Sequence, residues 1–176
     1  MKWKPFTHRG EIFDLSHLHD TSLTVVQPAK DDKPEVVYDL EVTFGLHCFT
    51  SGLKDGEKLD LELKYCDSRE CRHFDKQRYE LSKQLPAIIA ALRQKKCFHS
   101  GKGNFFLVEL MGISGTKQQY EVYFAVSKAS GGNGKLNLFV QSAYIRTQGQ
   151  QPQKKPIGFC ILLHNVKNSK PIRVPQ

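Results

Sequence analysis

The sequence predicts an α+β protein: an antiparallel sheet of five or more strands with one main helix, at about residues 76–94, packed on a face. Three observations predict this class. Several segments alternate apolar and polar residues with a period of two, which is typical of half-buried strands. One segment repeats its apolar residues at helical spacing. Short turns join most of the later strands, so we expect sequential strands to run antiparallel.

Two strands are predicted before the helix. Residues 36–46 place apolar side chains on one face and mostly polar side chains on the other. Residues 59–65 alternate leucines with charged residues in the same way. The segment 53–57 has the composition of a turn, so the two strands are expected to form a hairpin with a long loop.

The main helix is predicted from an apolar stripe that begins at Leu81. Apolar residues follow it at i+4, i+7, i+8 and i+11, which gives the helix one apolar face. Pro86 lies inside this stripe. Either the helix kinks there, or a second helix begins with the proline in its first turn, capped by Ser82 or a neighbour.

Four more strands are predicted after the helix, at residues 105–111, 120–128, 136–144 and 157–163. The first of them is apolar on both faces apart from one glutamate, so we expect it in the middle of the sheet. Residues 130–134, Ser-Gly-Gly-Asn-Gly, are typical of a hairpin turn.

We expect residues 1–176 to form a single domain, because this length is sufficient for one substantial core. Residues 1–35 show no regular pattern and are predicted to be irregular. Residues 148–156 are polar and basic, which predicts a mobile loop. The basic, proline-containing tail 167–176 is predicted to be frayed.

The charge balance favours a polyanionic partner. Lysine and arginine number 26 against 18 aspartate and glutamate, which gives a formal net charge of +8 and an isoelectric point near 9.3. Such an excess favours RNA or single-stranded nucleic acid, and the alternative is a basic surface that binds no ligand. A hydrophobic content of 39% excludes a disordered chain.

The sequence also predicts the compartment. The N-terminal residues lack the apolar stretch of a secretory signal, and no segment is long and apolar enough to cross a bilayer. We therefore expect a cytoplasmic protein without membrane contact. Five cysteines, an odd number, fit reduced thiols better than a disulfide framework.

Candidate catalytic residues come mainly from residues 44–50 and 72–86. Strand alternation places His47 on the polar face beside acidic residues, where an imidazole suits acid/base chemistry near neutral pH. Arginines at a helix start suit phosphate binding, and the alternative is a solvated helix face with acidic partners. Tyr144 either ends the inward face of its strand or contacts phosphate. The catalytic candidates are His47, Arg72, Arg78, Tyr79 and Tyr144, and the nucleic-acid-binding candidates are Arg93, Lys95, Lys96 and Arg146.

A zinc site is a weaker hypothesis. Cys66, Cys71 and His73 have ligand chemistry, with His47 or Cys48 as a fourth ligand. The spacing of the two cysteines lies at the edge of the usual range, so ordinary semi-buried cysteines are the better prediction. The sequence assigns no metal and no cofactor, and it contains no glycine-rich phosphate loop, nucleophile elbow or His-Glu-x-x-His motif.

Three motifs carry a resemblance over residues 38–146: Phe-x-x-His-Cys-Phe-Thr, Arg-x-Phe-Asp-x-x-Arg-Tyr-x-x-Ser-x-x-Leu-Pro and Val-x-Ser-Ala-Tyr. Their combination resembles an uncharacterised group of bacterial and prophage-associated proteins. The predicted order of a helix and then an antiparallel meander is also similar to barnase and RelE-like endoribonucleases. That similarity implies metal-independent RNA cleavage by attack of a 2′-OH on the adjacent phosphate.

The leading hypothesis is a cytoplasmic protein that binds RNA or cleaves it without metal, such as a toxin or a mobile-element factor. In the enzymatic version His47 acts as the acid/base, the arginines hold phosphate, and a tyrosine stacks on a base. The alternatives are a non-enzymatic adaptor for protein or nucleic acid, and a zinc-stabilised module. Convergence of His47, Arg78 and Tyr144 would favour the first hypothesis, and scattering would favour the adaptor.

Overall fold

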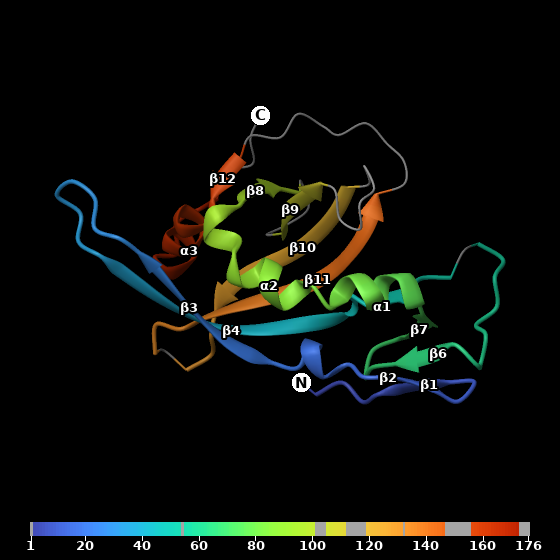
Figure 1. The fold of residues 1–176 in the computed structure, drawn as a ribbon. Helices are drawn as coiled ribbons and strands as arrows, with labels where there is room; N and C mark the ends of the chain where they lie inside the picture. Colours follow the sequence, from blue (N-terminus) through green and yellow to red (C-terminus); the bar gives the residue numbers. More distant parts are fainter. Residues whose placement is uncertain are drawn as a thin grey trace.

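The computed structural model describes residues 2–53, 55–100, 105–111, 119–131, 133–146 and 156–172, with backbone alone for 105–111 and 119. The predicted α+β class is confirmed (Figure 1). In chain order the elements are β1 (Phe6–His8), β2 (Glu11–Phe13), η1 (Ser16–Leu18), β3 (Thr21–Gln27), β4 (Val36–His47), β5 (Thr50–Ser51), β6 (Lys64–Cys66), β7 (Cys71–Phe74), α1 (Lys76–Ser82), α2 (Leu85–Ala90), η2 (Leu92–Gln94), β8 (Lys96–His99), β9 (Phe105–Met111), β10 (Gln119–Lys128), β11 (Leu136–Arg146), β12 (Pro156–Gly158) and α3 (Phe159–Lys167).

The central sheet of the described residues has seven strands in the order β12-β8-β9-β10-β11-β4-β3. It is mixed, because β4 pairs in parallel with β11, from Leu40 opposite Leu136 onwards. The other pairs in this sheet are antiparallel. The prediction of a wholly antiparallel sheet is therefore wrong at one position, where β4 lies between β3 and a strand from the other half of the chain.

The predicted strand at residues 59–65 is wrong for most of its length. Only Lys64–Cys66 forms a strand, and it belongs to a separate small sheet in the order β5-β7-β6. The residues just before β6 form a turn that Asp60 stabilises. The Asp60 carboxylate accepts a hydrogen bond from the backbone N–H of Glu62, and the Asp60 carbonyl oxygen accepts one from the backbone N–H of Leu63. Such local bonds compete with strand pairing, and Leu61 is left 79% exposed.

The predicted main helix is two short helices and a 3-10 turn. Asp75 caps α1, and its carboxylate accepts a hydrogen bond from the backbone N–H of Arg78. Pro86 lies in the first turn of α2, which was the second of the two expected arrangements. The cap of α2 is Gln84 rather than Ser82. A proline at this position ends α1 because it cannot continue the hydrogen-bond ladder.

The predicted last strand, residues 157–163, is mostly helix. β12 ends at Gly158 and α3 follows directly. Its buried residues are Phe159, Leu162 and Leu163, which share one helical face, while Ile161 is exposed. A short apolar run fits a buried strand and a buried helix equally well, so the spacing of apolar residues does not distinguish the two. Among the described residues, no helix is long and apolar enough to cross a membrane.

Residues 2–35 contain regular structure, contrary to the prediction of an irregular segment. They form β1, β2, η1 and β3, and β3 is the edge strand next to β4. Trp3 is buried, and its indole N–H donates a hydrogen bond to the carbonyl oxygen of Phe44 at 3.1 Å. The alternation in β3 is too short to stand out in the sequence. Of the predicted mobile loop and frayed tail, residues 148–155 and 173–176 lie outside the described residues.

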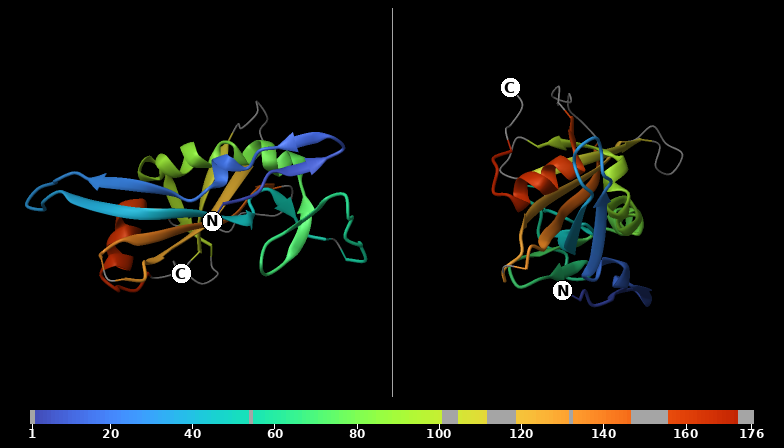
Figure 2. Two further views of the ribbon diagram at one scale, coloured as in Figure 1. Left: turned by 90° about the horizontal axis from the view of Figure 1, so that it is seen from below. Right: turned by 90° about the vertical axis from the view of Figure 1, so that its left-hand side faces the viewer.

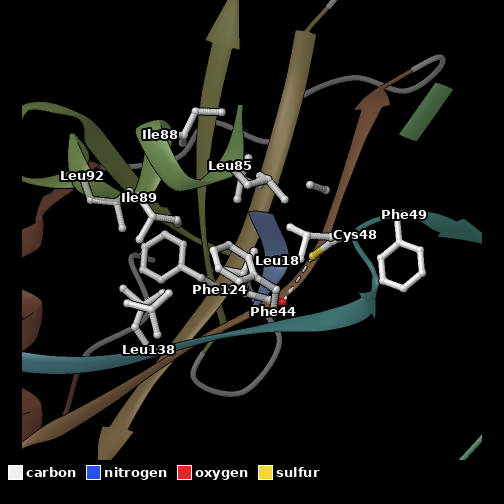
Figure 3. Close-up of a cluster of buried hydrophobic side chains, with 14 of the residues drawn as sticks. Leu18, Phe44, Cys48, Phe49, Leu85, Ile88, Ile89, Leu92, Phe124 and Leu138 are labelled. Atoms are coloured by element: carbon white, nitrogen blue, oxygen red, sulfur yellow. Dashed lines mark hydrogen bonds between the residues drawn. The ribbon is translucent and has the colours of Figure 1, made fainter. Parts of the chain in front are cut away.

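Helices α2 and α3 pack on the same face of the central sheet. In Figure 3 the side chains of α2 point onto the strands, with Ile89 beside Phe124. Phe159 of α3 contacts Phe124 edge-on, with ring centroids 6.0 Å apart. The turn between β3 and β4 projects at the end of the molecule opposite to the small sheet β5-β7-β6 (Figures 1 and 2).

The small sheet carries a disulfide. Cys66 and Cys71 are direct partners of β6 and β7, and their sulfur atoms are bonded. The prediction of five reduced thiols is therefore wrong at these two positions. Free thiols are found at Cys48, Cys97 and Cys160, and burial raises the pKa of Cys48 and of Cys97 to about 12.

Reduction of this disulfide should lower the free energy of unfolding. The closed loop is short, so its effect on unfolded-chain entropy is about 2 kcal/mol. We expect dithiothreitol to shift urea denaturation by this amount. The control is the double variant Cys66→Ser/Cys71→Ser. Its free energy of unfolding should equal that of the reduced protein and should not change when dithiothreitol is added. Five free thiols in the non-reduced protein, counted by mass spectrometry, would contradict the bond.

Candidate functional site

The second face of the sheet, opposite α2 and α3, presents Thr43, His47, Tyr123, Phe139 and Tyr144. Register places them together, because Thr43 pairs with Phe139 and His47 with Ser142 along the parallel ladder. Tyr123 pairs with Ser142 across the antiparallel ladder. All five side chains are half-buried, so this face is accessible in part. The prediction that His47 lies on the face opposite the core is consistent with this register, and Cys48 beside it is buried.

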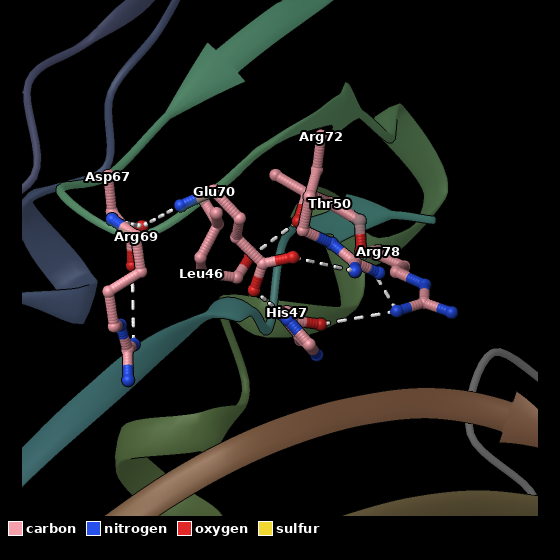
Figure 4. Close-up of polar contacts among 8 residues, drawn as sticks. All are labelled: Leu46, His47, Thr50, Asp67, Arg69, Glu70, Arg72 and Arg78. Carbon is pink, nitrogen blue, oxygen red and sulfur yellow. Dashed lines mark hydrogen bonds and ion pairs between the residues drawn. The ribbon is translucent and has the colours of Figure 1, made fainter. Parts of the chain in front are cut away.

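His47 forms a hydrogen bond with Glu70 rather than with the acidic residues of its own strand. Its Nε2 lies 2.6 Å from Glu70 Oε1, and the imidazole is 31% exposed (Figure 4). The hydrogen bond from His47 lowers the pKa of Glu70. Glu70 also accepts a hydrogen bond from Arg72 at 3.4 Å. Nothing in the sequence period marks Glu70, because it lies in the turn between β6 and β7.

Arg72 lies on β7, not at the helix start as predicted. Its Nε donates to Thr50 Oγ1 at 3.1 Å, and its side chain is only 15% exposed. Thr50 is fully buried and donates its hydroxyl proton to the carbonyl oxygen of Leu46. Arg72 of β7 therefore bonds to β5 within the small sheet, at the residue where the turn after β4 ends.

Arg78 lies in the first turn of α1, as predicted, but its guanidinium faces the protein. One of its nitrogens, Nη1, donates to the carbonyl oxygens of His47 at 3.2 Å and Thr50 at 2.9 Å (Figure 4). Burial lowers the pKa of Arg78, although Asp75 nearby opposes this effect. Arg78 thus fixes the turn that presents His47.

Tyr144 lies next to Arg78 because of a bulge in β11. The register shifts between Val140 and Ser142, so residues beyond the shift change faces. The expectation that Tyr144 continues the inward face is therefore wrong, while its alternative as a site residue stays open. The Arg78 guanidinium lies 5.3 Å from the Tyr144 ring centre. The Tyr144 ring stacks with that of Tyr123 at 5.5 Å.

A close contact accompanies this bulge. A Cβ atom on Gly45 of β4 would lie 2.9 Å from the carbonyl oxygen of Gln141 and 3.0 Å from the Phe139 ring. The first distance is shorter than Cβ atoms show in real structures, and the second is tighter than most real Cβ contacts. Only glycine fits at this position, so Gly45 lets β4 approach the bulged strand.

A buried carboxylate completes the second face. Glu121 is fully buried and accepts hydrogen bonds from Arg146 Nε and from the Tyr123 hydroxyl, both at 2.6 Å. Burial, and then the bond to Glu121, raise the pKa of Tyr123. Arg146, a predicted nucleic-acid contact, is thus engaged in an internal ion pair. Glu121 and Tyr123 were missed because alternation alone does not distinguish them from surface residues.

The remaining candidates do not join this cluster. Tyr79 is buried among aromatic rings, including Phe13 at 5.2 Å and Phe74 at 5.6 Å. Its ring is part of the core, which does not favour the predicted catalytic role, and that role stays a prediction. Arg93, Lys95 and Lys96 are exposed, but they follow α2 at the start of β8, away from α1 (Figure 1).

The zinc hypothesis loses its proposed ligands. Cys66 and Cys71 are bonded to each other, and His73 Nε2 accepts a hydrogen bond from the backbone N–H of Asp60 at 2.7 Å. Within the described ranges no group of three or more His, Cys, Asp or Glu side chains is arranged to hold a metal.

The cluster borders a small hollow of about 140 Å³. It is lined by Gly45, Leu46, His47, Arg69, Glu70, Phe139 and Gln141. A histidine held by a carboxylate, with arginines and tyrosines nearby, has the chemistry to move a proton and to bind an anion. Of the five catalytic candidates, Arg78 links two others, because it bonds to the backbone carbonyl of His47 and lies over the Tyr144 ring, and Arg72 contacts the same network through Glu70.

The fold and this cluster define an α+β protein with a polar, partly accessible sheet face. A family model described as the YjaZ family matches residues 5–167, so the chain belongs to the YjaZ family. The chain is 32% identical over 178 residues to the protein YjaZ of Escherichia coli (strain K12), covering 99% of this chain and 96% of that protein. The predicted relationship to a bacterial family is confirmed. No solved structure matches the chain significantly, so the similarity to barnase and RelE-like enzymes stays a prediction.

Replacing Arg78 with alanine should destabilise the protein, because two partly buried carbonyl groups lose a charged donor. We expect the free energy of unfolding to fall by about 2 kcal/mol. Chemical denaturation followed by circular dichroism measures this change. Lys83→Ala on the same helix is the control, since its exposed pair with Glu80 contributes less than about 1 kcal/mol. Equal stabilities of the two variants would show that the Arg78 bonds do not support the turn.

Proposed function

We propose that this protein binds single-stranded RNA on the second face of the sheet. The observation that carries the proposal is the convergence of His47, Arg78 and Tyr144 from three separate parts of the chain. Single-stranded RNA is recognised by aromatic rings and arginine planes together with phosphate contacts. The site offers both kinds of group within one network.

The arginines can still contact phosphate. Within the described part of the chain, Nη2 of Arg72 and Nη2 of Arg78 have no hydrogen-bond acceptor, although Nε and Nη1 of Arg72 and Nη1 of Arg78 are bonded within the protein. Internal bonds hold each guanidinium in place, so binding a phosphate oxygen would cost little side-chain entropy. The net charge of +8 makes the affinity depend on salt, because phosphate contacts release counterions.

Cleavage of the bound RNA is the second candidate function, and the His47–Glu70 pair favours it. If Nε2 carries the proton shared with Glu70, then Nδ1 is free to accept a proton from a ribose 2′-OH. The 2′-oxygen then attacks the adjacent phosphorus and displaces the 5′-oxygen, leaving a 2′,3′-cyclic phosphate. Arg72 and Arg78 would stabilise the charge that develops on the phosphate, and the leaving oxygen takes up a proton.

We further propose a cytoplasmic location. There the exposed Cys66–Cys71 bond would be accessible to thiol reductants. An adaptor that binds a protein partner is the remaining alternative, and the two tests below separate it from RNA binding.

Truncating Tyr144 should weaken RNA binding. Loss of one aromatic platform costs about 1–3 kcal/mol, equivalent to a 5- to 150-fold rise in Kd. Fluorescence anisotropy of a labelled ten-nucleotide RNA measures Kd for Tyr144→Ala. Tyr144→Phe is the matched control, because it keeps the ring and should bind like the parent. An unchanged Kd in a folded Tyr144→Ala protein, or no binding by the parent at low salt, would exclude this site for RNA.

If the protein cleaves RNA, His47→Ala should lower the rate by about 10²–10⁴-fold with RNA affinity nearly unchanged. Gel analysis of RNA incubated with excess enzyme and EDTA measures the rate. His164→Ala is the control, because this histidine lies on α3, distant from the cluster (Figure 1). Equal rates for His47→Ala and the parent would reject the catalytic role. No cleavage by the parent, with or without divalent ions, would leave a binding protein.

A further inference from the structure

A second groove lies between the N-terminal segment and β6. Its volume is about 610 Å³, which lies in the range of small-ligand sites. It is lined by Lys2, Trp3, Lys4, Pro5, Phe6, Lys64, Tyr65, Cys66, Asp67 and Ser68. None of these residues belongs to the cluster around His47.

The rim of the groove is positively charged. Lys2, Lys4 and Lys64 are exposed, and no carboxylate among the described residues pairs with them. The one acidic residue that lines the groove, Asp67, has hydrogen-bond donors of its own. Its carboxylate accepts bonds from the Arg69 guanidinium and from the backbone N–H groups of Arg69 and Glu70. Three lysines without a counter-charge favour an anionic ligand.

The floor of the groove is aromatic and held in place. Trp3 and Tyr65 have ring centroids 6.1 Å apart, and Phe6 lies 6.0 Å from Tyr65. The Tyr65 hydroxyl donates to the carbonyl oxygen of Lys4 at 2.7 Å, which ties β6 to the N-terminal segment. The half-buried Tyr65 ring leaves part of its surface accessible from the groove.

The groove and the His47 cluster share one turn. Asp67 and Ser68 line the groove, while Arg69 and Glu70 line the hollow beside His47. The carbonyl oxygen of Glu70 accepts a hydrogen bond from the Asp67 backbone at 3.0 Å, so these four residues form a tight turn. A strand bound in the groove therefore needs to pass only this turn to reach the cluster.

We propose that the groove binds a neighbouring segment of the same single-stranded RNA, with phosphates on the three lysines and a base against the aromatic floor. This inference rests on the proposed function, since the RNA continues to the His47 cluster. Phosphates alternate with bases along RNA, which fits a charged rim above aromatic rings better than an acidic peptide does.

The test uses the triple variant Lys2→Gln/Lys4→Gln/Lys64→Gln and labelled oligouridylate of ten nucleotides. Each lost phosphate contact on a single strand lowers the slope of log Kd against log salt by about 0.7, so the triple variant should lose about 2 units of slope. Lys33→Gln is the matched control, because this exposed lysine lies in the β3–β4 turn at the opposite end of the molecule. For this control, the slope of log Kd against log salt should fall by less than the ~0.7 expected for one phosphate contact.

Trp3 provides an independent readout, because it is the single tryptophan of the chain. Oligouridylate should change its fluorescence in a saturable manner in the parent and in Tyr144→Phe. A parent-like slope in the triple variant, or RNA binding by anisotropy without a Trp3 response, would overturn the groove and leave the His47 site intact. A lysine-dependent Trp3 response with normal binding by Tyr144→Ala would instead support the groove and reject the proposed site. A Trp3 response to polyglutamate alone would overturn both in favour of a protein partner.

Discussion

The candidate site depends on the close approach of β4 to the bulged part of β11. Gly45 permits this approach, since any Cβ there would collide with the Gln141 carbonyl. The bulge then turns Tyr144 to the face that carries His47. Because of this contact, the Tyr144 ring stacks with that of Tyr123, and the Arg78 guanidinium packs over the Tyr144 ring. A larger residue at position 45 would therefore disturb the site through the Gln141 backbone and the Phe139 ring, without contacting His47 or Tyr144 directly.

Part of this arrangement could be predicted from the sequence. The long alternation of β4 was sufficient to place His47 and Cys48 on opposite faces. Tyr144 was misplaced because one extra residue in a strand reverses every later side chain, and no sequence signal marked the bulge. Leu61 and α3 were misassigned for a different reason: local hydrogen bonds and tertiary packing decided between conformations that the apolar pattern fits equally well.

The charged groups fall into two kinds with different physical roles. Arg72, Arg78 and Arg146 each form bonds within the protein and so fix geometry. The groove lysines carry charge without such bonds, and in the proposal above they provide the attraction for a polyanion. Sequence composition counts both kinds alike. A net charge of +8 therefore favours a polyanionic partner, but it does not indicate which cations are free to bind one.

The parallel pairing of β4 with β11 also has a consequence for how the chain folds. Leu40 meets Leu136 across this ladder, so the centre of the sheet closes only after most of the chain is present. The β3–β4 and β10–β11 hairpins, in contrast, pair neighbouring segments and can form early. Their docking, a contact of high sequence separation, is the expected slow step. Until it occurs, the apolar edge of β4 stays uncovered, and this is where the nascent protein is most prone to aggregate.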